Sequence, residues 1–474
     1  MKARAIALVA LALAGSRCAV GPNYSRPALP MPPQFYGAEA AVAEARSLAD
    51  LPWWEVFQDP VLEGLIEEAL RQGYDARLAA ARVEEAQALY GVARGALYPG
   101  VGYQLGFERS RQDQFVNRDG NVETKWTAKL GFSWELDLFG RIRRQTEAAR
   151  AQYLATEEAR RGVLLSLVAE VATTYLELKE LDTELDIAKR TTAAFQSTYE
   201  LFERRLEGGA ASALETARAE ASLGQVAAQI PEIERAIAAK ENQLNYLLGR
   251  PPQPLPRDGV RIPLPPDIPA GLPSALLERR PDVREAEEQL VSANALVGAA
   301  KARYFPTLTL TGLFGNVSPE LGDLFANGKT YSLAAGLVGP LFQAGQIKKN
   351  YAAAQARFEQ GKVLYEAAVT NALREVSGAL VDRTKLVETA KQRERTVKAY
   401  AEAVRLANIR YDSGLSAYFE VLDAQQQLFP AEISLAQTRR DQLLAVVDLY
   451  KALGGGWPIA PPPPAPAPAP PGDR

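Results

Sequence analysis

The sequence of 474 residues predicts a membrane protein of mixed α and β structure, and three observations lead to this fold class. The second half of the chain repeats the first half at a shift of about 206 residues. The chain begins with an export signal, yet no stretch of about 18 apolar residues follows that would form a transmembrane helix. Segments of alternating apolar and polar residues indicate strands with one face towards lipid and the other towards water.

The internal repeat is of domain size. A repeat of this length exceeds the roughly 20–50 residues of a solenoid unit. A duplicated chain closes a ring with half as many subunits as it has copies, so the repeat points towards a symmetric assembly. The first matched set, at a shift of 207, pairs Asp75, Arg77, Gly91 and Pro99 with Asp282, Arg284, Gly298 and Pro306. The second set, at a shift of 205, pairs Arg205, Gly209, Glu215 and Ala219 with Arg410, Gly414, Glu420 and Ala424.

The composition argues against most enzyme classes. The chain has no histidine, which removes the usual general base, the usual partner of a nucleophile and the commonest metal ligand. Its one cysteine, Cys18, excludes an intrachain disulfide and a thiolate zinc cluster. The net charge of −3 is not that of a nucleic-acid-binding protein. We therefore expect no cofactor, no metal site, no catalytic residue and no nucleic-acid partner.

The chain divides into six expected segments. Lys2 and Arg4 precede the apolar run of residues 6–14, which is the pattern of a signal peptide. Proline-rich stretches separate the two repeats and end the chain. The segments are a signal peptide (1–17), an N-terminal extended segment (18–60), a first structural repeat (61–250), a Pro-rich connector (251–273), a second structural repeat (274–456) and a disordered Pro/Ala tail (457–474).

Each repeat contains a helix, a strand pair, a very long helix, a turn and a return helix. Residues 142–206 hold no proline and one glycine, so they predict a rod of about 95 Å at 1.5 Å per residue. Its apolar residues recur at spacings of three and four, which is typical of a coiled-coil seam. The expected elements of the first repeat are helix 61–97, strands 101–109 and 123–138, helix 142–206, the turn at Gly208-Gly209, and helix 212–248 with a kink at Pro231.

The second repeat has the same order. A proline-free helix is again followed by a glycine turn, here at Ser413-Gly414. The return helix contains Pro430, where we expect a kink. The expected elements are helix 274–304, strands 307–314 and 330–341, helix 346–412 and a return helix that follows the turn and ends at about residue 453.

The strand at residues 125–137 shows the alternation most clearly. Trp126, Leu130 and Trp134 fall on its apolar face, while Lys125 and Glu135 fall on its polar face. A strand of a soluble sandwich shows the same pattern, but the export signal favours a membrane strand. Four strands cannot close a membrane barrel, and open edges in lipid are costly. The strands must therefore be shared between chains, of which two would supply eight strands and three would supply twelve.

Several motifs together resemble the TolC-like family of outer-membrane efflux proteins, in its lipoprotein branch. The resemblance implies a homotrimer that forms a 12-stranded transmembrane β-barrel, four strands per chain, continuous with a long periplasmic α-helical coiled-coil barrel. It also implies a periplasmic adaptor and an inner-membrane efflux transporter as partners. The motifs are Cys-Ala-Val-Gly-Pro-Asn-Tyr-Ser-Arg-Pro (18–27), Trp53-Trp54 with Phe57 and Asp59-Pro60, Trp-Glu-Leu-Asp-Leu-Phe-Gly-Arg (134–141), Arg-Arg-Pro-Asp-Val-Arg (279–284), Gly-Pro-Leu-Phe (339–342) and Leu-Asp-Ala-Gln (422–425).

The resemblance also implies three kinds of site. Cys18 would be acylated, although Arg17 stands where the family has a small residue. A periplasmic gate would include the apolar Phe419 and, one turn later on the same helix face, Asp423. The corresponding residues of the first repeat are Leu214 for Phe419 and Arg218 for Asp423. Adaptor hairpins would dock on residues of the two turns, namely Gly208, Gly209, Ser212, Ser413, Gly414, Leu415 and Ser416.

Each of these sites has a purely structural alternative. Gly209 and Gly414 are also the residues expected at left-handed helix caps. Phe419 and Asp423 could be a core phenylalanine and an ordinary surface aspartate. Arg218 could instead pair with a carboxylate and hold the mouth shut.

The resulting functional hypothesis is a passive exit duct for small molecules in the outer membrane, lipid-anchored through Cys18, gated at its periplasmic mouth and driven by the partner transporter. One alternative is a secreted coiled-coil scaffold or adhesin, which the long helices would suit. Another is a carboxylate-dependent hydrolase, and scattered acidic residues are the only support for it. The cargo stays open among drugs, metal ions and metabolites.

Overall fold

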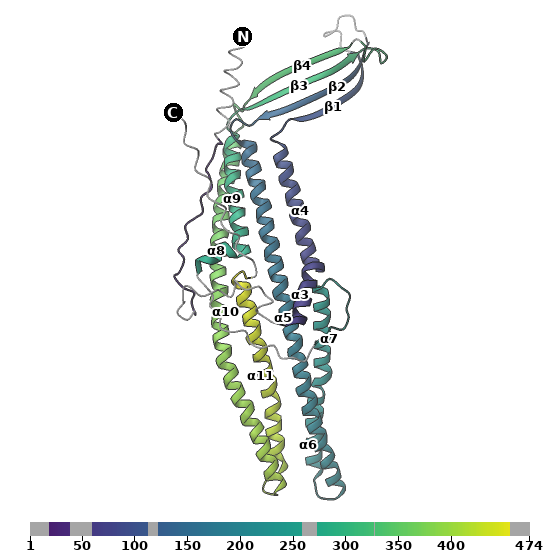
Figure 1. The fold of residues 1–474 in the computed structure, drawn as a ribbon, viewed down its shortest axis with the longest axis vertical. Coiled ribbons are helices and arrows are strands. Elements are labelled where there is room, and N and C mark those ends of the chain that lie inside the picture. Colours follow the sequence, from purple (N-terminus) through teal and green to yellow (C-terminus); the bar gives the residue numbers. More distant parts are fainter. Residues whose placement is uncertain (1–18, 38–58, 112–121, 258–272, 327, 456–474) are drawn as a thin grey trace. The chain divides into compact units, whose positions relative to one another are not determined.

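The computed structural model describes residues 19–37, 59–111, 122–257, 273–326 and 328–455 (Figure 1). Two compact units divide the chain, and each draws residues from both repeats. Unit 1 comprises Met1–Leu29, Arg82–Glu157 and Glu285–Ala367, and unit 2 comprises Pro30–Ala81, Glu158–Arg284 and Ala368–Arg474. The expected signal peptide, Cys18 and the expected Pro/Ala tail from residue 457 lie outside the described residues.

Unit 1 contains a four-stranded antiparallel sheet (Figure 1). Its strands are β1 (Gly100–Arg111), β2 (Val122–Leu136), β3 (Thr307–Ser318) and β4 (Lys329–Val338), in that spatial order. The two strand pairs expected from the sequence are therefore present, and they join where β2 of the first repeat pairs with β3 of the second. β1 and β4 are the two edges of the sheet, so each has an edge with no strand beside it among the described residues.

The strand register assembles the alternating residues into one continuous apolar face. Directly opposite residues of neighbouring strands share a face, and Phe132 lies opposite Val101 on one side and Gly312 on the other. Gly312 leaves room for this ring, because a Cβ there would collide with Phe132 Cε1. The exposed apolar residues of this face include Val101, Tyr103, Leu105, Phe107, Leu130, Phe132, Phe314, Tyr331, Leu333 and Leu337. An apolar face of this extent is expected to contact lipid or another protein.

The turn from β2 into the long helix α5 (Arg141–Glu207) is fixed by acidic residues of the strand. The Asp137 carboxylate accepts a hydrogen bond from the Arg143 backbone N–H at 2.8 Å, and thereby caps the start of the helix. Arg141 forms an ion pair with Glu135 at 2.7 Å. Gly140 takes the left-handed conformation, with φ of +79°. The equivalent turn from β4 into α10 (Gln346–Asp412) has Gly345 at φ of +81°.

Unit 2 is helical, and its core lies between four helices. α5 and α10 are 67 residues each, close to the lengths expected from their lack of proline. The return helices are α6 (Ala213–Ala227) and α7 (Gln229–Leu247) in the first repeat and α11 (Tyr418–Ala452) in the second. One apolar cluster joins α5, α6, α10 and α11, namely Phe195, Phe202, Ala219, Val226, Ala407, Tyr418, Val421 and Leu422.

Two of the expected helices are each divided into two shorter helices. The helix expected over 61–97 is two helices, α3 (Pro60–Gln72) and α4 (Tyr74–Gly95), separated by the extended Gly73. Gly73 is enforced by packing, since a Cβ there would lie 2.9 Å from the Leu247 carbonyl oxygen. The helix expected over 274–304 is likewise two helices, α8 (Leu276–Arg279) and α9 (Pro281–Ala302). Arg280 is extended between them, as the residue before a proline prefers.

The return helices behave differently at their prolines. The helix expected over 212–248 is interrupted at Ala228, three residues before Pro231. A proline has no N–H to donate to the preceding turn, which accounts for an interruption here. α11 continues as one helix through Pro430. Among the helices of the described residues, none is both long and apolar enough to cross a membrane.

Candidate functional site at the helix tips

The turn between α5 and α6, residues 208–212, is a compact cap. Gly209 has a φ of +70°, which lets the Ala210 N–H reach the Arg205 carbonyl oxygen at 2.7 Å. Ser212 then starts α6 with a capping box, in which its hydroxyl accepts from the Glu215 N–H while Glu215 accepts from the Ser212 N–H at 2.9 Å. The N–H and the hydroxyl of Ser212 both donate to the Glu215 carboxylate, and these two hydrogen bonds lower the pKa of Glu215.

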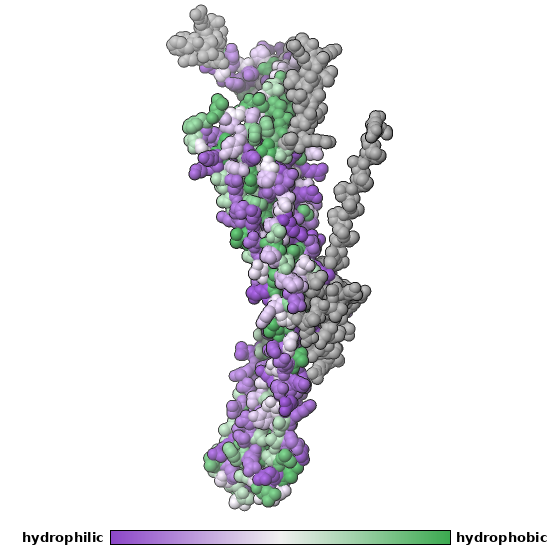
Figure 2. Space-filling view, turned by 90° about the vertical axis from the view of Figure 1, so that its left-hand side faces the viewer, coloured by the Kyte–Doolittle hydropathy of each residue, from purple (hydrophilic) through white to green (hydrophobic). Residues whose placement is uncertain are grey.

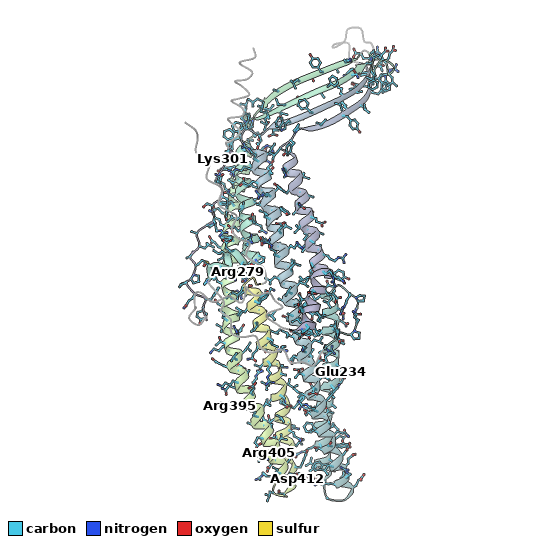
Figure 3. The ribbon with its side chains drawn as sticks, viewed as in Figure 1. Glu234, Arg279, Lys301, Arg395, Arg405 and Asp412 are labelled. Atoms are coloured by element: carbon cyan, nitrogen blue, oxygen red, sulfur yellow. The ribbon has the colours of Figure 1, made fainter. Side chains whose placement is uncertain are left out.

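The turn between α10 and α11, residues 413–417, has the same glycine but a different cap. Asp412 ends α10 (Figure 3), and Gly414 follows with a φ of +69°. The Leu415 N–H donates to the Arg410 carbonyl oxygen at 2.8 Å. Ala417 precedes α11 where Ser212 precedes α6, so this helix has no side-chain cap. Glu420, the counterpart of Glu215, forms an ion pair with Arg410 at 3.4 Å instead.

Tyr418 holds the two hairpins together immediately behind the turns. Its ring is buried against Phe202 of α5 at 4.6 Å and against Tyr411 of α10 at 5.1 Å between ring centroids. Its hydroxyl donates to the Thr198 hydroxyl at 2.8 Å. Burial raises the pKa of Tyr418, so the phenol stays neutral near neutral pH. Tyr418 therefore fixes the start of α11, which carries the expected gate residues Phe419 and Asp423.

The expected gate residues lie in the first two turns of α6 and α11, and one contact joins the two helices there. Leu214, Phe419 and Asp423 are exposed, and Phe419 is therefore not a core residue of the single chain. The Arg218 guanidinium lies 5.7 Å from the centroid of the Phe419 ring, within the range of a cation–π contact. The structure thus brings an arginine of the first repeat onto an aromatic ring of the second.

The surface around the turns is mixed rather than uniformly polar. Figure 2 shows hydrophobic side chains among hydrophilic ones over the ends of the helical hairpins. Exposed leucines contribute to it, namely Leu206, Leu214 and Leu415. Ser416 adds a buried hydroxyl that has no hydrogen-bond partner within the described part of the chain. Such a surface suits contact with another protein more than simple solvation.

Comparison with known proteins assigns the chain to a protein family. The family model described as outer membrane efflux protein matches residues 65–250 and 272–455. The chain belongs to this family. Two similar proteins are the solvent efflux pump outer membrane protein SrpC of Pseudomonas putida and the outer membrane protein OprJ of Pseudomonas aeruginosa. SrpC is 36% identical over 469 residues, which cover 97% of this chain and 100% of SrpC. OprJ is 35% identical over 466 residues, which cover 95% of this chain and 96% of OprJ.

Solved outer-membrane channels share the fold. The channel OprN is 30% identical, with a TM-score of 0.86 over 93% of this chain and 100% of that chain. The open state of the Neisseria gonorrhoeae channel MtrE is 32% identical, with a TM-score of 0.82 over 93% of this chain and 98% of that chain. This member of the outer membrane efflux protein family is thus an outer-membrane channel protein of an efflux system. These relatives give no support to a secreted coiled-coil scaffold.

One contact at the tips of this efflux protein was not foreseen from the sequence. The Arg205 guanidinium of α5 lies 5.2 Å from the centroid of the Tyr411 ring of α10 and also donates a hydrogen bond to the Tyr411 hydroxyl. Arg205 stands out in the sequence as a repeat match, and Tyr411 as part of an apolar stripe. Neither signal indicates that the two residues meet across the hairpins.

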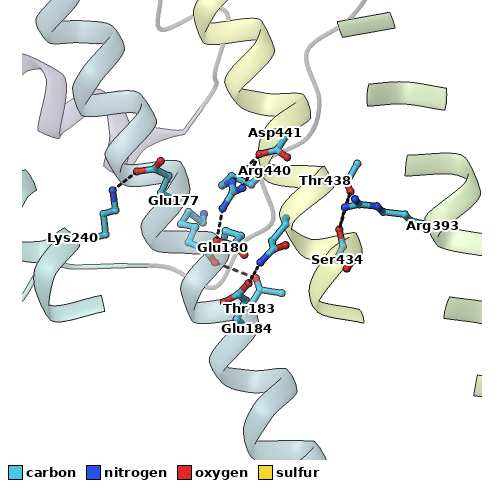
Figure 4. A network of polar contacts seen from close by, with 12 residues as sticks. Glu177, Glu180, Thr183, Glu184, Lys240, Arg393, Ser434, Thr438, Arg440 and Asp441 are labelled. Carbon is cyan, nitrogen blue, oxygen red and sulfur yellow. Dashed lines mark hydrogen bonds and ion pairs between the residues drawn. The ribbon is translucent and has the colours of Figure 1, made fainter. Parts of the chain in front are cut away.

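A buried polar network also links the hairpins farther along the helices (Figure 4). Glu180 and Glu184, one turn apart on α5, are both buried. Arg440 of α11 donates to Glu180 at 3.2 Å, and Gln437 of α11 donates to Glu184 at 2.8 Å. Burial, together with a hydrogen bond and repulsion from Glu184, raises the pKa of Glu180 to about 8. Within the described residues, no cluster of three or more acidic or cysteine side chains could hold a metal ion.

Proposed function

We propose that the chain is the passive exit duct of a tripartite efflux pump and works as a homotrimer. Three copies would join their four-stranded sheets into a 12-stranded transmembrane barrel, continuous with a periplasmic tunnel made of the long helices. The open edges of β1 and β4 and the continuous apolar face support this assembly, because an unpaired sheet edge in lipid costs several kcal/mol for each unsatisfied group. An acyl chain on Cys18 would add to the anchoring in the outer membrane.

The helix tips would form the periplasmic mouth. The observation that carries this proposal is the contact of the Arg218 guanidinium with the exposed Phe419 ring, close behind the two glycine turns. In a trimer, three Phe419 rings would narrow the opening and three Asp423 carboxylates would attract cations and repel anions. Arg218 would hold Phe419 in place in the resting state, or pair with a carboxylate of a neighbouring copy.

A periplasmic adaptor would dock on the two turns and connect the duct to an inner-membrane transporter, which would supply the energy. The left-handed glycines leave open space around their Cα atoms, so a partner backbone could approach closely. The docking residues are Gly208, Gly209, Ser212, Ser413, Gly414, Leu415 and Ser416. Relatives named for pumps of solvent, toluene and antibiotics support small organic molecules as the cargo.

Conductance of the purified protein in planar bilayers tests the gate. We expect Asp423→Ala to reduce the preference for K⁺ over Cl⁻ by roughly a factor of two or more, because the carboxylate ring would be removed. Glu234→Ala is the matched control, since Glu234 is an exposed acidic residue of α7 (Figure 3). Equal ion selectivity of the Asp423→Ala and Glu234→Ala channels would show that Asp423 does not line the opening.

A further inference from the structure

The apolar face of the sheet ends in aromatic residues near the turns that join β1 to β2 and β3 to β4. On the β1 side, Phe107 packs on Trp126 of β2, with ring centroids 4.5 Å apart. On the β4 side, Tyr331 lies opposite Phe314 of β3. Aromatic rings in this position are typical of the boundary between hydrocarbon and headgroups in outer-membrane proteins.

A basic residue follows each aromatic pair on the same face. Arg109 lies two residues beyond Phe107, and Lys329 lies two residues beyond Tyr331, in both cases towards the hairpin turns. Side chains two residues apart on a strand share a face, so both cations lie on the apolar face of the sheet. Both residues are exposed. Arg111 continues the row on β1.

The length of the apolar face puts these cations at headgroup depth. On β2 the face extends from Trp126 to Leu136, a strand length of about 33 Å. For a strand tilted by about 40°, this length spans about 25 Å of membrane, which is the height of the apolar band in outer-membrane barrels. Arg109 and Lys329 lie just beyond that band, where the headgroups of lipids begin.

The cross-strand neighbours of both cations are uncharged. Arg109 lies opposite Thr124, and Lys329 lies opposite Asn316. No carboxylate directly across the described strands therefore balances either positive charge. Both cations present their charge outwards beside an apolar surface, which suits an anionic group that is attached to acyl chains.

Cations elsewhere on the sheet have carboxylate neighbours. Lys125, which lies on the polar face, is opposite Glu108. At the other end of the sheet, Arg141 forms an ion pair with Glu135 at 2.7 Å. Lys125 therefore provides a comparison for Arg109 and Lys329, because it has the same charge and lies near the same end of the sheet but on the opposite face.

The strand connections determine which side of the membrane the cations face. The helices join the sheet where β1 and β3 begin and where β2 and β4 end, and the hairpin turns lie at the other end (Figure 1). With the helices on the periplasmic side, as described under Proposed function, the hairpin end faces outwards. The outer leaflet of an outer membrane consists largely of acylated sugar lipids that carry phosphate groups.

We propose that Arg109 and Lys329 bind phosphate groups of outer-leaflet lipids, whose acyl chains lie along the apolar side chains next to them. Arginine and lysine both donate charge-assisted hydrogen bonds to phosphate oxygens. The apolar residues beside each cation favour a phosphorylated lipid over free phosphate. The proposal rests on the membrane orientation given under Proposed function and adds a lipid-binding site on the outside of the duct.

Binding of lipid A, an acylated disaccharide with two phosphates, tests the proposal. The affinity of the full-length protein in nonionic detergent is measured by native mass spectrometry. We expect Arg109→Gln and Lys329→Gln each to weaken binding about fivefold, because a basic residue contributes about that factor at an anionic lipid surface. Arg109→Lys keeps the charge and should stay within about a factor of two of the unsubstituted protein.

The matched control is Lys125→Gln, which removes a positive charge from the polar face of the same sheet. It should leave the affinity for lipid A unchanged. Lipid A from which both phosphates have been removed should bind the unsubstituted protein and all variants equally. An excess of inorganic phosphate should not displace lipid A, because it cannot contact the apolar face.

Equal affinity of the unsubstituted protein and both glutamine variants, or an equal loss in Lys125→Gln, would overturn the lipid site. Displacement of lipid A by inorganic phosphate would also overturn it, because the site would then bind the free anion. Conductance in planar bilayers separates this result from the proposed function. Conducting channels with no effect of Arg109 or Lys329 on lipid A binding would leave the duct intact. Lipid A binding that depends on these residues, in a protein that forms no channel, would overturn the duct and support the lipid site.

Discussion

Glu180 is the most perturbed acidic residue that the helical hairpins bury between them. Burial opposes its ionisation, and the hydrogen bond to Glu184 is best made when Glu180 carries the proton. Arg440 acts in the other direction but does not overcome these effects, so the pKa stays near 8. At neutral pH Glu180 therefore carries its proton in most molecules.

Replacing Glu180 by glutamine should flatten the pH dependence of stability. Below about pH 4.5, Glu180 is protonated in both the folded and the unfolded chain. As the pH rises towards 8, the unfolded chain releases this proton first, so the free energy of unfolding falls, and the loss is complete above about pH 8. The glutamine amide of the variant keeps the hydrogen bonds but cannot ionise. Thermal unfolding of the detergent-solubilised protein between pH 5 and 8.5 measures the difference.

The control for this experiment is Glu234→Gln, which removes an exposed carboxyl of α7. It should leave the pH dependence of the unfolding temperature unchanged. Parallel pH profiles for Glu180→Gln and the unsubstituted protein would mean that Glu180 is already ionised in the folded state.

The contact between Arg218 and Phe419 can also be tested by replacing single side chains. A cation–π contact at an exposed site contributes about 0.5–1 kcal/mol, which corresponds to a factor of about 2–5 in an equilibrium. If this contact stabilises the resting mouth, Arg218→Ala and Phe419→Ala should each raise the open probability of single channels by about that factor. The double variant should raise it no further than the larger single effect.

The matched control is Arg405→Ala, which removes an exposed arginine of α10 that pairs with Glu402 on its own helix. It should leave the open probability unchanged. Fully additive effects of the Arg218 and Phe419 variants would show that the two residues act independently of each other.

At the scale of elements, a variant at Gly414 tests whether the glycine turn is only a helix cap or also a docking surface. Nothing lies within 4 Å of a Cβ built on Gly414, so the single chain has room for a side chain there. Asparagine tolerates the left-handed conformation, and Gly414→Asn should therefore shift the unfolding temperature by only a few degrees. If the adaptor needs the bare backbone, the same variant should slow ethidium efflux from cells several-fold.

Gly378→Asn, inside α10 and also without neighbours within 4 Å, is the control for added bulk away from the tips. It should retain ethidium efflux. Normal ethidium efflux by Gly414→Asn would show that Gly414 is only a helix cap and is not part of the docking surface.

The long elements were predictable from the sequence because their signals are local. A run of 65 residues with neither proline nor a second glycine predicts α5 to within one residue at each end, and strict alternation predicts β2. The interruption at Gly73 was not predictable in the same way, whereas Pro231 indicated a break close to Ala228. A Cβ at Gly73 would meet the Ala69 carbonyl oxygen of its own helix and also the Leu247 carbonyl oxygen, and the second contact joins residues far apart in the sequence.

The candidate site was predictable in outline and not in its contacts. Glycines at equivalent positions of both repeats identified the turns, and their positive φ values agree with the left-handed caps expected there. The motif resemblance supplied Phe419 and Asp423. The pairings of Arg205 with Tyr411 and of Arg440 with Glu180 depend on how α10 and α11 pack on α5, which no periodicity within one helix specifies.

At the scale of the whole molecule, the repeat explains both what the halves share and where they differ. Both halves supply two strands and a helical hairpin with a 67-residue helix. They differ at the tips, where Ser212 caps α6 but Ala417 leaves α11 without a side-chain cap. They also differ at the strand-to-helix turns, where the first repeat has acidic residues and the second has apolar ones. The proposed gate lies at positions where the two halves have diverged.

The two open edges of the sheet have a consequence for the order of events in assembly. A lone copy in lipid would leave the outer backbone groups of β1 and β4 without partners, at several kcal/mol for each group. Stable insertion of a single copy is therefore too costly, and copies must associate before or while they enter the bilayer. Membrane entry then depends on the concentration of newly exported chains. Subunits already in the membrane cannot exchange without leaving it, so the composition of each channel is fixed when it forms.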